Sequence, residues 1–221
     1  MKKHTRSRIL TALFIALATA ATAASTGVTI NGTPLDDAVS TGDIGWVYDS
    51  STKFLTLTNA GPFTIAGANT AGKVGVVVQE GVTTTITLSN LRLSSSTYNY
   101  CALSLETNAC VSLLLAGNNN YLSSGTGRAG IEVPAGTSLS ITNAPGDTTA
   151  NLETRSSGNG AGIGGGYPRR HAGTITISGG TITATGSYDG GAGIGGGSEG
   201  NGGVVTISGG TVTAIGGGYA A

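Results

Sequence analysis

The chain has 221 residues, of which 39 are glycine, and only 10 % are charged. Glycine and proline together stay below the roughly 25–30 % that is typical of disordered low-complexity chains. Basic and acidic residues balance at 11 each, so the composition excludes a strongly basic nucleic-acid-binding protein.

Residues 1–23 predict a secretory signal peptide. Lys2 to Arg8 contains four basic residues, Ile9 to Ala18 is apolar, and Ala21 to Ala23 has the small-x-small pattern of a cleavage site. The apolar run is too short for a stable bilayer span. We therefore expect a secreted, extracellular protein, either free or associated with the cell surface, with no transmembrane span after signal removal.

Removal of the signal would change the charge balance. Seven basic residues would then face eleven acidic ones, a mature net charge of about four negative. No basic stripe remains, so we expect no nucleic-acid partner.

Residues 25–66 differ from the rest of the chain and predict an N-terminal β cap. Gly45 to Asp49 and Phe54 to Thr58 alternate in polarity, as the two strands of a hairpin do. The exposed edge of a repeat domain needs protection, and a cap over the first repeat provides it.

Residues 67–221 contain internal repeats. The segment GAGIGGGYPRRHAGTITISGGTITATG runs from Gly160 to Gly186, and GAGIGGGSEGNGGVVTISGGTVTAIG runs from Gly191 to Gly216. Ile163 and Ile194 are 31 residues apart. Self-similarity at such a period is typical of stacked supersecondary units.

Three degenerate units precede these two, and the five units predict three apolar columns. The first column is Val77, Leu103, Ile131, Ile163 and Ile194; the second is Ile86, Val111, Leu139, Ile175 and Val205; the third is Leu93, Leu122, Leu152, Ile182 and Val212. Three short strands per unit predict an all-β fold, a parallel β-helix of about five coils. We expect it to be right-handed, because parallel crossovers are right-handed in nearly all known cases.

Glycine pairs mark the corners of these coils. We expect at least one positive φ at Gly179-Gly180 and at Gly209-Gly210, where the chain must turn sharply between strands. The glycine runs 164–166 and 195–197 predict a second corner.

The two cysteines are predicted to be free. In the repeat register Cys101 aligns with alanines, whereas Cys110 begins the following strand. They would then lie one side of the coil apart, beyond the roughly 7 Å between Cα atoms that a disulfide tolerates.

The C-terminal coil is expected to be uncapped. After Gly216 the sequence begins no further GAGIGGG unit. An open rung edge invites pairing with another chain, so the sequence indicates either a piece of a longer protein or end-to-end self-association through this coil.

The segment GWVYDSSTKFLTLTNAG, followed by GAGIGGG and GGTITISGGTITATG, resembles a group of glycine-rich secreted bacterial surface proteins. These are described as carbohydrate-binding-domain or adhesin-like β-helix proteins. The resemblance covers nearly the whole mature chain and implies an exported β-helix that binds polysaccharide at the cell surface. It offers no catalytic or ligand residues to carry over.

Tyrosines at one corner are the first candidate ligand site. Tyr188 and Tyr219 are 31 residues apart, so they should stack on the same edge, and Tyr98 and Tyr100 fall at the corresponding corner of an earlier coil. An exposed aromatic edge can dock the apolar faces of sugar rings, or the rings can simply pack over turn backbone. The coils between are expected to place Arg128 and Asn159 near this corner.

A basic corner is the second candidate. It consists of Arg169 and Arg170 within Tyr167 to His171, next to Glu199 of the following coil. It could bind an acidic sugar or merely neutralise the neighbouring carboxylate.

Cofactor, metal and catalytic motifs are weak. Two GxGxxG matches are followed by strand sequence rather than the helix that a dinucleotide site needs, so we interpret them as corner glycines. Calcium nonapeptides are not seen, and Asp36, Asp37 and Asp43 would need carbonyl oxygens to complete a site. No cofactor and no metal are expected.

We also expect no enzymatic activity. After signal removal His171 is the sole histidine, and Glu106, Glu132 and Glu153 occupy different places in their units, so no acid–base pair is visible. The sequence therefore favours a non-catalytic binding or adhesion module with a polysaccharide or glycan partner. The alternatives are a structural spacer or self-assembling surface element and, less favoured, a polysaccharide lyase or hydrolase.

Overall fold

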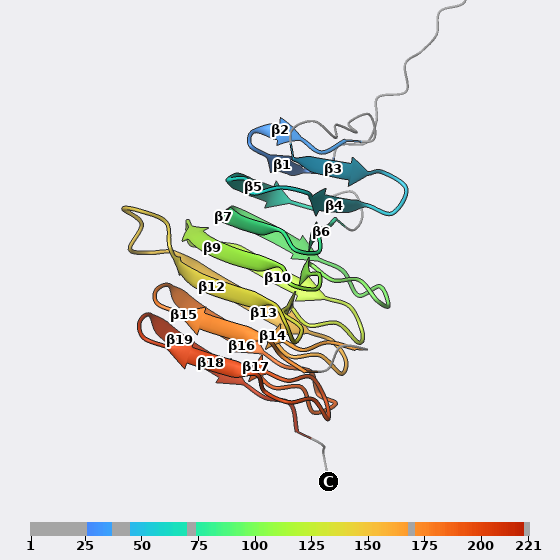
Figure 1. Ribbon diagram of the computed structural model, residues 1–221, viewed down its shortest axis with the longest axis vertical. Coiled ribbons are helices and arrows are strands. Elements are labelled where there is room, and N and C mark those ends of the chain that lie inside the picture. Colours follow the sequence, from blue (N-terminus) through green and yellow to red (C-terminus); the bar gives the residue numbers. More distant parts are fainter. Residues whose placement is uncertain (1–25, 37–44, 70–73, 168–170, 219–221) are drawn as a thin grey trace, which may run out of the picture.

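The computed structural model describes residues 26–36, 45–69, 74–167 and 171–218. Over these residues the chain forms strands, turns and loops without a helix, and they contain no helix long and apolar enough to cross a membrane. The strands stack as the rungs of a parallel β-helix of five coils (Figure 1), which confirms the predicted fold class. The signal-peptide prediction for residues 1–23 lies outside the described residues.

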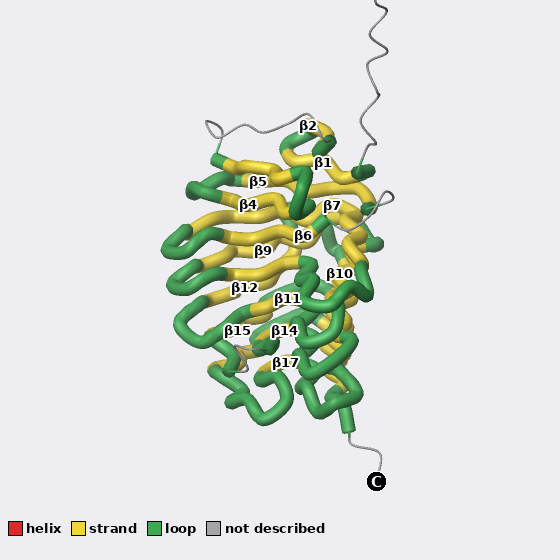
Figure 2. Tube along the Cα trace, turned by 90° about the vertical axis from the view of Figure 1, so that its right-hand side faces the viewer, coloured by secondary structure: helices red, strands yellow, loops and turns green. Residues whose placement is uncertain are grey.

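Each coil contributes a strand segment to each of three sides, and the segments of successive coils stack on one another (Figure 2). Side 1 contains β3 (Trp46–Asp49), β4 (Phe54–Leu57), β6 (Gly75–Val78), β8 (Leu103–Leu105), β11 (Ile131–Glu132), β14 (Ile163–Gly164) and β17 (Ile194–Gly195). Side 2 contains β5 (Phe63–Ala68), the first part of β7 (Thr83–Ser94), β9 (Cys110–Ala116), β12 (Ser138–Asn143), β15 (Thr174–Ile177) and β18 (Val204–Ile207). Side 3 contains the last part of β7, β10 (Asn120–Ser124), β13 (Asn151–Ser156), β16 (Thr181–Thr185) and β19 (Thr211–Ile215).

Strand β7 joins sides 2 and 3. Its residues 83–89 pair with β9, and its residues 92–94 pair with β10. Between them Asn90 has a φ of 51°, which turns the strand from one side to the next. Asparagine tolerates this left-handed conformation better than most residues. In this coil, a single strand that bends at Asn90 makes the turn from side 2 to side 3. In later coils, glycine residues make that turn.

The apolar columns form the core, and the register confirms most of their predicted members. Ile131 pairs in register with both Leu103 and Ile163, and Leu139 pairs with Val111 and Ile175. Their side chains are almost completely buried. Each such aliphatic contributes about 1.5–3 kcal/mol of burial before the cost of ordering the chain is subtracted.

Three column predictions are wrong by one or two residues. Val76, not Val77, pairs with Leu103, and Thr84, not Ile86, pairs with Val111. Three consecutive valines leave the inward position undecided, and in β7 both Thr84 and Ile86 face inward, so the polarity pattern cannot fix the register.

The third correction lies on side 3. Leu122 pairs with Thr154, and Leu152 pairs with Asn120 instead. Asn120 is buried, and its side-chain amide donates to the backbone oxygens of Ala116 and Asn151 at 3.1 and 3.0 Å. A satisfied polar side chain thus takes a core position that the pattern assigned to an aliphatic one.

Antiparallel strands lie at the N-terminal edge of the sheets. β3 and β4 form the predicted hairpin, while β1 (Val28–Ile30) pairs antiparallel with β2 (Thr33–Pro34) and with β5. Trp46 and Tyr48 are buried in the core cluster. Parallel stacking starts earlier than residue 67, because β4 already pairs in parallel with β6 and β5 with β7.

Gly180 and Gly210 have φ angles of 91° and 82°, as the glycine-pair corners predict. At Gly180 a Cβ atom would lie 2.8 Å from Leu115 Cδ1. This corner therefore needs glycine chiefly for its positive φ, and a Cβ atom would in addition require the end of the Leu115 side chain to shift.

We predict that Gly180→Val lowers the free energy of unfolding by about 1–3 kcal/mol, the cost of a left-handed non-glycine residue. Thr181→Val is the matched control, because Thr181 is exposed on the neighbouring strand position and should change stability by less than about 0.5 kcal/mol. Urea denaturation followed by circular dichroism measures both. Equal losses in the two variants would show that the corner does not require glycine.

Candidate functional site

One corner of the β-helix, here called the tyrosine corner, gathers the candidate binding residues. It consists of the loops 95–102, 125–130, 157–162 and 186–193, which connect side 3 to side 1 in successive coils. Tyr98 and Tyr188 both lie in it, with exposed fractions of 63 % and 67 %. Arg128 and Asn159 lie in the loops between them, as the repeat register predicts.

A groove of about 200 Å³ opens at this corner. Its lining residues come from three coils and from one returning loop: Tyr98, Thr126, Gly127, Asn159 and Tyr167. The sequence assigned Tyr98 and Tyr167 to two separate corners, whereas the structure brings them to the same groove. The described lining residues offer aromatic rings, a hydroxyl group and an amide, and none of them carries a charge.

Tyr98 occupies the tip of a well-anchored turn. Tyr100 N donates to Thr97 O at 3.1 Å, and Asn99 N donates to Thr126 O of the next coil at 3.3 Å. Asn99 has a φ of 59°, the left-handed conformation that lets the chain double back. The turn therefore presents the Tyr98 ring to solvent on a fixed base.

Tyr100 corrects the sequence prediction. Its side chain is only 1 % exposed, and its hydroxyl group donates to Val74 O at 2.5 Å. Burial raises its pKa above the ordinary tyrosine value. Tyr100 therefore holds the loop against the core and does not face a ligand. Tyr98 and Tyr100 are two positions apart, and the turn at Asn99 decides which of the two rings faces solvent.

Tyr167 reaches the groove by a tight glycine segment. Tyr167 N donates to Gly127 O, and Ala161 N donates to Gly165 O at 2.9 Å. These bonds fold the loop after β14 back onto the tyrosine corner. Arg169, Arg170 and Tyr219 of the predicted sites lie outside the described residues.

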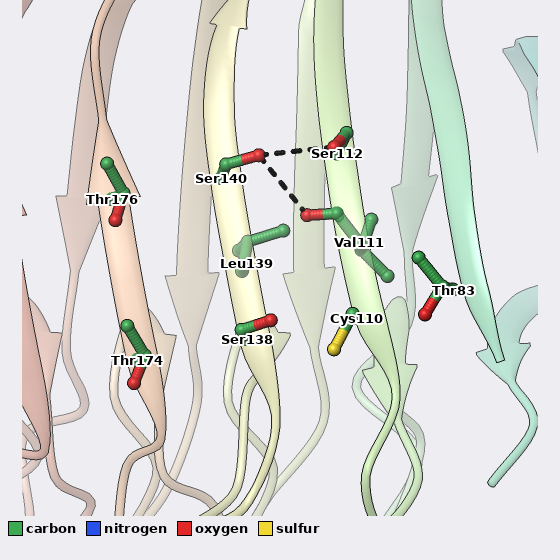
Figure 3. Close-up of a pocket in the computed structure, with 9 residues that line it drawn as sticks. All are labelled: Thr83, Cys110, Val111, Ser112, Ser138, Leu139, Ser140, Thr174 and Thr176. Atoms are coloured by element: carbon green, nitrogen blue, oxygen red, sulfur yellow. Dashed lines mark hydrogen bonds between the residues drawn. The ribbon is translucent and has the colours of Figure 1, made fainter. Parts of the chain in front are cut away.

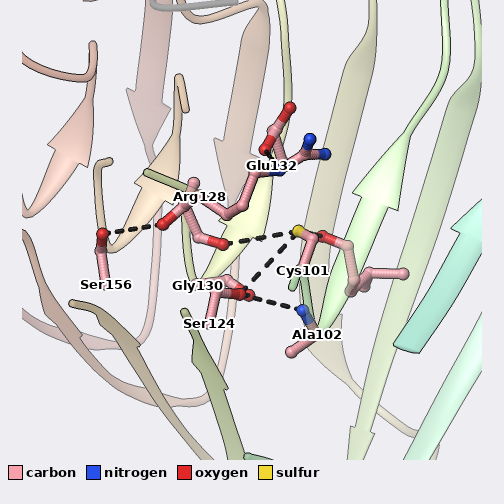
Figure 4. Close-up of polar contacts among 9 residues, drawn as sticks. Cys101, Ala102, Ser124, Arg128, Gly130, Glu132 and Ser156 are labelled. Carbon is pink, nitrogen blue, oxygen red and sulfur yellow. Dashed lines mark hydrogen bonds and ion pairs between the residues drawn. The ribbon is translucent and has the colours of Figure 1, made fainter. Parts of the chain in front are cut away.

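A buried ion pair joins the loop 125–130 to β11 (Figure 4). Arg128 Nε is 2.6 Å from Glu132 Oε2, and the Glu132 side chain is 1 % exposed. At Gly166 a Cβ atom would lie 2.6 Å from the same carboxylate oxygen and 2.7 Å from Ala129 N. The segment that leads to Tyr167 thus passes directly over the carboxylate, and only glycine fits there.

Further polar contacts fix the backbone around this pair. Ser156 Oγ donates to Arg128 O at 2.8 Å, and Ser124 Oγ accepts from Ala102 N at 2.9 Å. Burial alone would lower the pKa of Arg128, but the Glu132 carboxylate and Cys101, which loses its proton only at the high pH where arginine titrates, outweigh it and raise the pKa. Arg128 therefore stays charged and holds the loop that carries Thr126 and Gly127.

Cys101 belongs to this cluster as a neutral thiol. Its Sγ lies 3.2 Å from Leu103 O and 3.5 Å from Ala129 O, and each of these oxygens can accept a hydrogen bond from the thiol. Burial, followed by the nearby charge of Glu132, raises its pKa to about 12. Cys101 and Cys110 are both free, which confirms the prediction. A thiol that stays protonated in this way is a poor nucleophile.

The exposed carboxylates of two turns have local structural roles. Asp49 accepts from the hydroxyl groups of Ser51 and Thr52, which lower its pKa to about 2. Asp147 accepts from Gly117 N at 2.6 Å, and this bond lowers its pKa as well. Both side chains act as turn-stabilising acceptors.

His171 and the metal-type residues form no site in the described chain. His171 is exposed, and its Nδ1 accepts from Asn201 N at 2.9 Å. The described residues contain no group of three or more His, Cys, Asp or Glu side chains that could hold a metal ion. Asp37 and Asp43 of the acidic N-terminal segment lie outside them.

A second hollow, of about 220 Å³, lies on side 2 (Figure 3). It is lined by residues of four neighbouring strands, most of which have short side chains: Thr83, Cys110, Val111, Ser112, Ser138, Leu139, Ser140, Thr174 and Thr176. Ser140 Oγ donates a hydrogen bond to Ser112 Oγ at 3.4 Å, so two hydroxyl groups of the hollow are already partners of each other. The hollow has no aromatic ring and no charge, which makes it a weaker candidate than the groove.

Sequence reasoning also missed an aromatic–basic pair on side 3. The guanidinium carbon of Arg92 lies 4.7 Å from the centroid of the Tyr121 ring, and Arg92 donates to Asn119 Oδ1 at 2.8 Å. The two residues belong to adjacent rungs, β7 and β10, and Tyr121 pairs with Arg92 in register. Only the side 3 register, which joins residues 29 apart, could have revealed this contact.

The sequence model of the β-helix repeat matches residues 148–167, 175–198 and 205–221. These ranges cover parts of the last three coils and agree with their stacked register. No curated protein and no solved structure matches the chain. The fold and this match together make it a β-helix repeat protein.

We predict that Glu132→Gln lowers the free energy of unfolding by about 3 kcal/mol, the lower end of the range for one partner removed from a buried ion pair. The lower end applies because a fifth of the Arg128 side chain remains exposed. Glu153→Gln is the control, since its 3.6 Å pair with Arg155 is half exposed and should contribute less than about 1 kcal/mol. Chemical denaturation compares the two, and equal effects would contradict a structural role for Glu132.

We also predict that one thiol per chain reacts in the native protein at pH 8 and two react after denaturation. Cys110 is partly exposed, whereas Cys101 is buried with a pKa of about 12. Its labelling should therefore be more than about 100-fold slower, because the thiolate is the reactive form. Peptide mapping after alkylation identifies the labelled residue. Native labelling of Cys101 at the rate of Cys110 would contradict this assignment.

Proposed function

We propose that the protein is an exported, non-catalytic carbohydrate-binding module and that the tyrosine-corner groove holds its ligand. The observation that carries this proposal is the groove itself, whose lining combines the rings of Tyr98 and Tyr167 with the polar side chains of Thr126 and Asn159. Aromatic faces cover the apolar C–H groups of a sugar ring, while hydroxyl and amide groups exchange hydrogen bonds with its hydroxyl groups. Both kinds of group are present within one concave site.

The lining favours a neutral sugar. Binding an acidic sugar would call for a cation in the site, and among the described residues Arg128, which follows Gly127 in the chain, is already paired with Glu132. A rigid binding site loses less conformational entropy on binding than a flexible one. The backbone bonds at Asn99, Tyr100 and Tyr167 supply such rigidity.

The groove extends across neighbouring coils rather than within one loop. Tyr98 precedes β8, Thr126 precedes β11 and Asn159 precedes β14, so the polar groups follow the helix axis. Successive rungs lie about 4.8 Å apart. A glycan chain laid along the axis would meet new groups at each rung, which supports an oligosaccharide rather than a single sugar.

The resemblance to secreted bacterial surface proteins and the predicted signal peptide support export of this module. In that setting the binding site would attach the protein, or the cell that bears it, to polysaccharide. The structural alternative, a spacer without a ligand, predicts no glycan binding.

We predict that the Tyr98→Ala/Tyr167→Ala variant loses glycan binding on an array by roughly 10–100-fold, since each aromatic contact contributes about 0.5–1.5 kcal/mol. Tyr188→Ala is the matched control: it is as exposed as Tyr98 and lies in the same corner, but it does not line the groove. Circular dichroism verifies that all forms are folded.

Binding that persists in the double variant would move the site elsewhere. Binding that depends on Tyr188 alone would do the same. If the wild-type protein binds no glycan, the carbohydrate proposal fails and the spacer function remains.

A further inference from the structure

The outward face of side 3 carries a small group of charged side chains around one aromatic ring. Arg92 of β7, Tyr121 of β10 and Glu153 of β13 follow one another in register on successive rungs. Arg155 lies in the next outward column of β13. Two arginines against one glutamate give this face a net charge of +1 (2 − 1), whereas the mature chain is predicted to be about four charges negative.

The guanidinium group of Arg92 is held in place by two neighbours. Its central carbon lies 4.7 Å from the centroid of the Tyr121 ring, within the range of a cation–π contact. Its Nη1 donates to Asn119 Oδ1 at 2.8 Å. A guanidinium group has five N–H donors, and the described residues supply a hydrogen-bond acceptor for this one alone. The other donors of a positioned, planar group are therefore available to a ligand.

Arg92 has no carboxylate partner among the described residues. The carboxylate on this face, Glu153, lies 3.6 Å from Arg155 and is thus already paired. Tyr121 stands between Arg92 and Glu153 in the register, so the strands that bear these two charges are separated by two rungs, about 9–10 Å. The positive charge of Arg92 is therefore not compensated on this face of the described chain.

The backbone that carries Arg92 is also fixed. Residues 92–94 form the first side 3 rung, and Asn69, which directly follows β5, is hydrogen-bonded along them. Asn69 N donates to Arg92 O at 3.1 Å. Its side-chain amide donates to Ser94 O at 2.8 Å and accepts from Ser94 N at 3.1 Å. A residue on such a base loses less conformational freedom on binding a ligand than a residue of a mobile loop.

We propose that Arg92, positioned by Tyr121 and Asn119, binds the anionic group of an acidic sugar in a polysaccharide. A planar guanidinium fork matches two oxygens of a carboxylate, and equally two oxygens of a tetrahedral oxyanion such as a sulfate ester. The uncompensated charge of Arg92 complements either group. The polysaccharide as the source of the anion rests on the function proposed above, whereas the anion site stands on the geometry of Arg92.

This site is separate from the tyrosine-corner groove, and the same strands lead from one to the other. Strand β10 carries Tyr121 and ends at Ser124, just before the loop that bears Thr126. Thr126 follows Tyr121 by five positions, at most about 18 Å of extended chain. A polysaccharide that contains both neutral and acidic sugars would therefore engage the groove and Arg92 at the same time.

The test is isothermal titration calorimetry of the full chain with three probes: an oligogalacturonate, its carboxyl-reduced neutral form and a sulfated galactan oligosaccharide. We expect at least one acidic probe to bind, and to bind more weakly as salt screens the charges. Arg92→Gln should weaken this binding by about 10–100-fold, the loss expected for hydrogen bonds to a charged group. Its affinity for the neutral probe should match that of the wild type. The acidic probe that depends on Arg92 identifies the anion as carboxylate or sulfate.

Arg155→Gln is the matched control, because it removes the same charge from the same face at a position that is already paired with Glu153. It should weaken acidic binding by less than about 3-fold. Arg92→Lys keeps the charge without the planar fork, so it should recover only part of the affinity. Circular dichroism verifies that all variants are folded.

Equal losses in Arg92→Gln and Arg155→Gln would indicate diffuse attraction and overturn the anion site. A parallel loss of neutral binding in Arg92→Gln would also overturn it, since a merely structural role predicts that result. A wild-type protein that binds the neutral probe alone would leave the groove proposal standing and remove this one. Arg92-dependent binding that is unchanged in Tyr98→Ala/Tyr167→Ala would instead support the anion site and remove the groove.

Discussion

The whole molecule depends on the hydrogen-bonded ladder between successive coils. The parallel pairing aligns four residues of side 1 in one register: Leu103, Ile131, Ile163 and Ile194. Loops that leave equivalent strands therefore start at equivalent positions in successive coils. Loops that are about 30 residues apart in the chain then become neighbours. Because of this ladder, Tyr98, Thr126 and Asn159 share a groove although nothing in their local sequence connects them.

The ladder alone does not shape the groove, since a corner loop could leave the strands in many directions. The buried pair of Arg128 and Glu132 restricts this freedom. A carboxylate in the core is tolerable only beside a cation, and Arg128 can supply one only if its loop lies close to β11. Gly166 then allows the segment that bears Tyr167 to cross over the carboxylate. The ion pair thus joins the loop that bears Thr126 and Gly127 to β11, and the segment that bears Tyr167 packs against its carboxylate.

The repeat pattern of the sequence predicted the coils, the corner glycines and the free cysteines, because each is tied to a period of about 30 residues. The prediction failed at positions where more than one pairing register between strands would bury the side chains equally well. Val76 and Val77 differ by one position within three valines, and Thr84 and Ile86 both face inward, so hydrophobicity does not choose between them. Asn120 was missed because its amide is satisfied by backbone groups of two coils, which only the folded chain brings together.

The candidate site was predictable only in part, for a similar reason. Periodicity placed Tyr98 and Tyr188 at one corner, and both are exposed there. It could not separate Tyr98 from Tyr100, because the turn at Asn99 sends one ring outward and the other into the core. Nor could it place Tyr167, whose loop leaves the repeat and folds back onto Gly127 through backbone bonds. A repeat period describes what each coil has in common with the next. A groove built from the irregular loops lies outside that pattern, and here those loops carry the aromatic rings that line the candidate site.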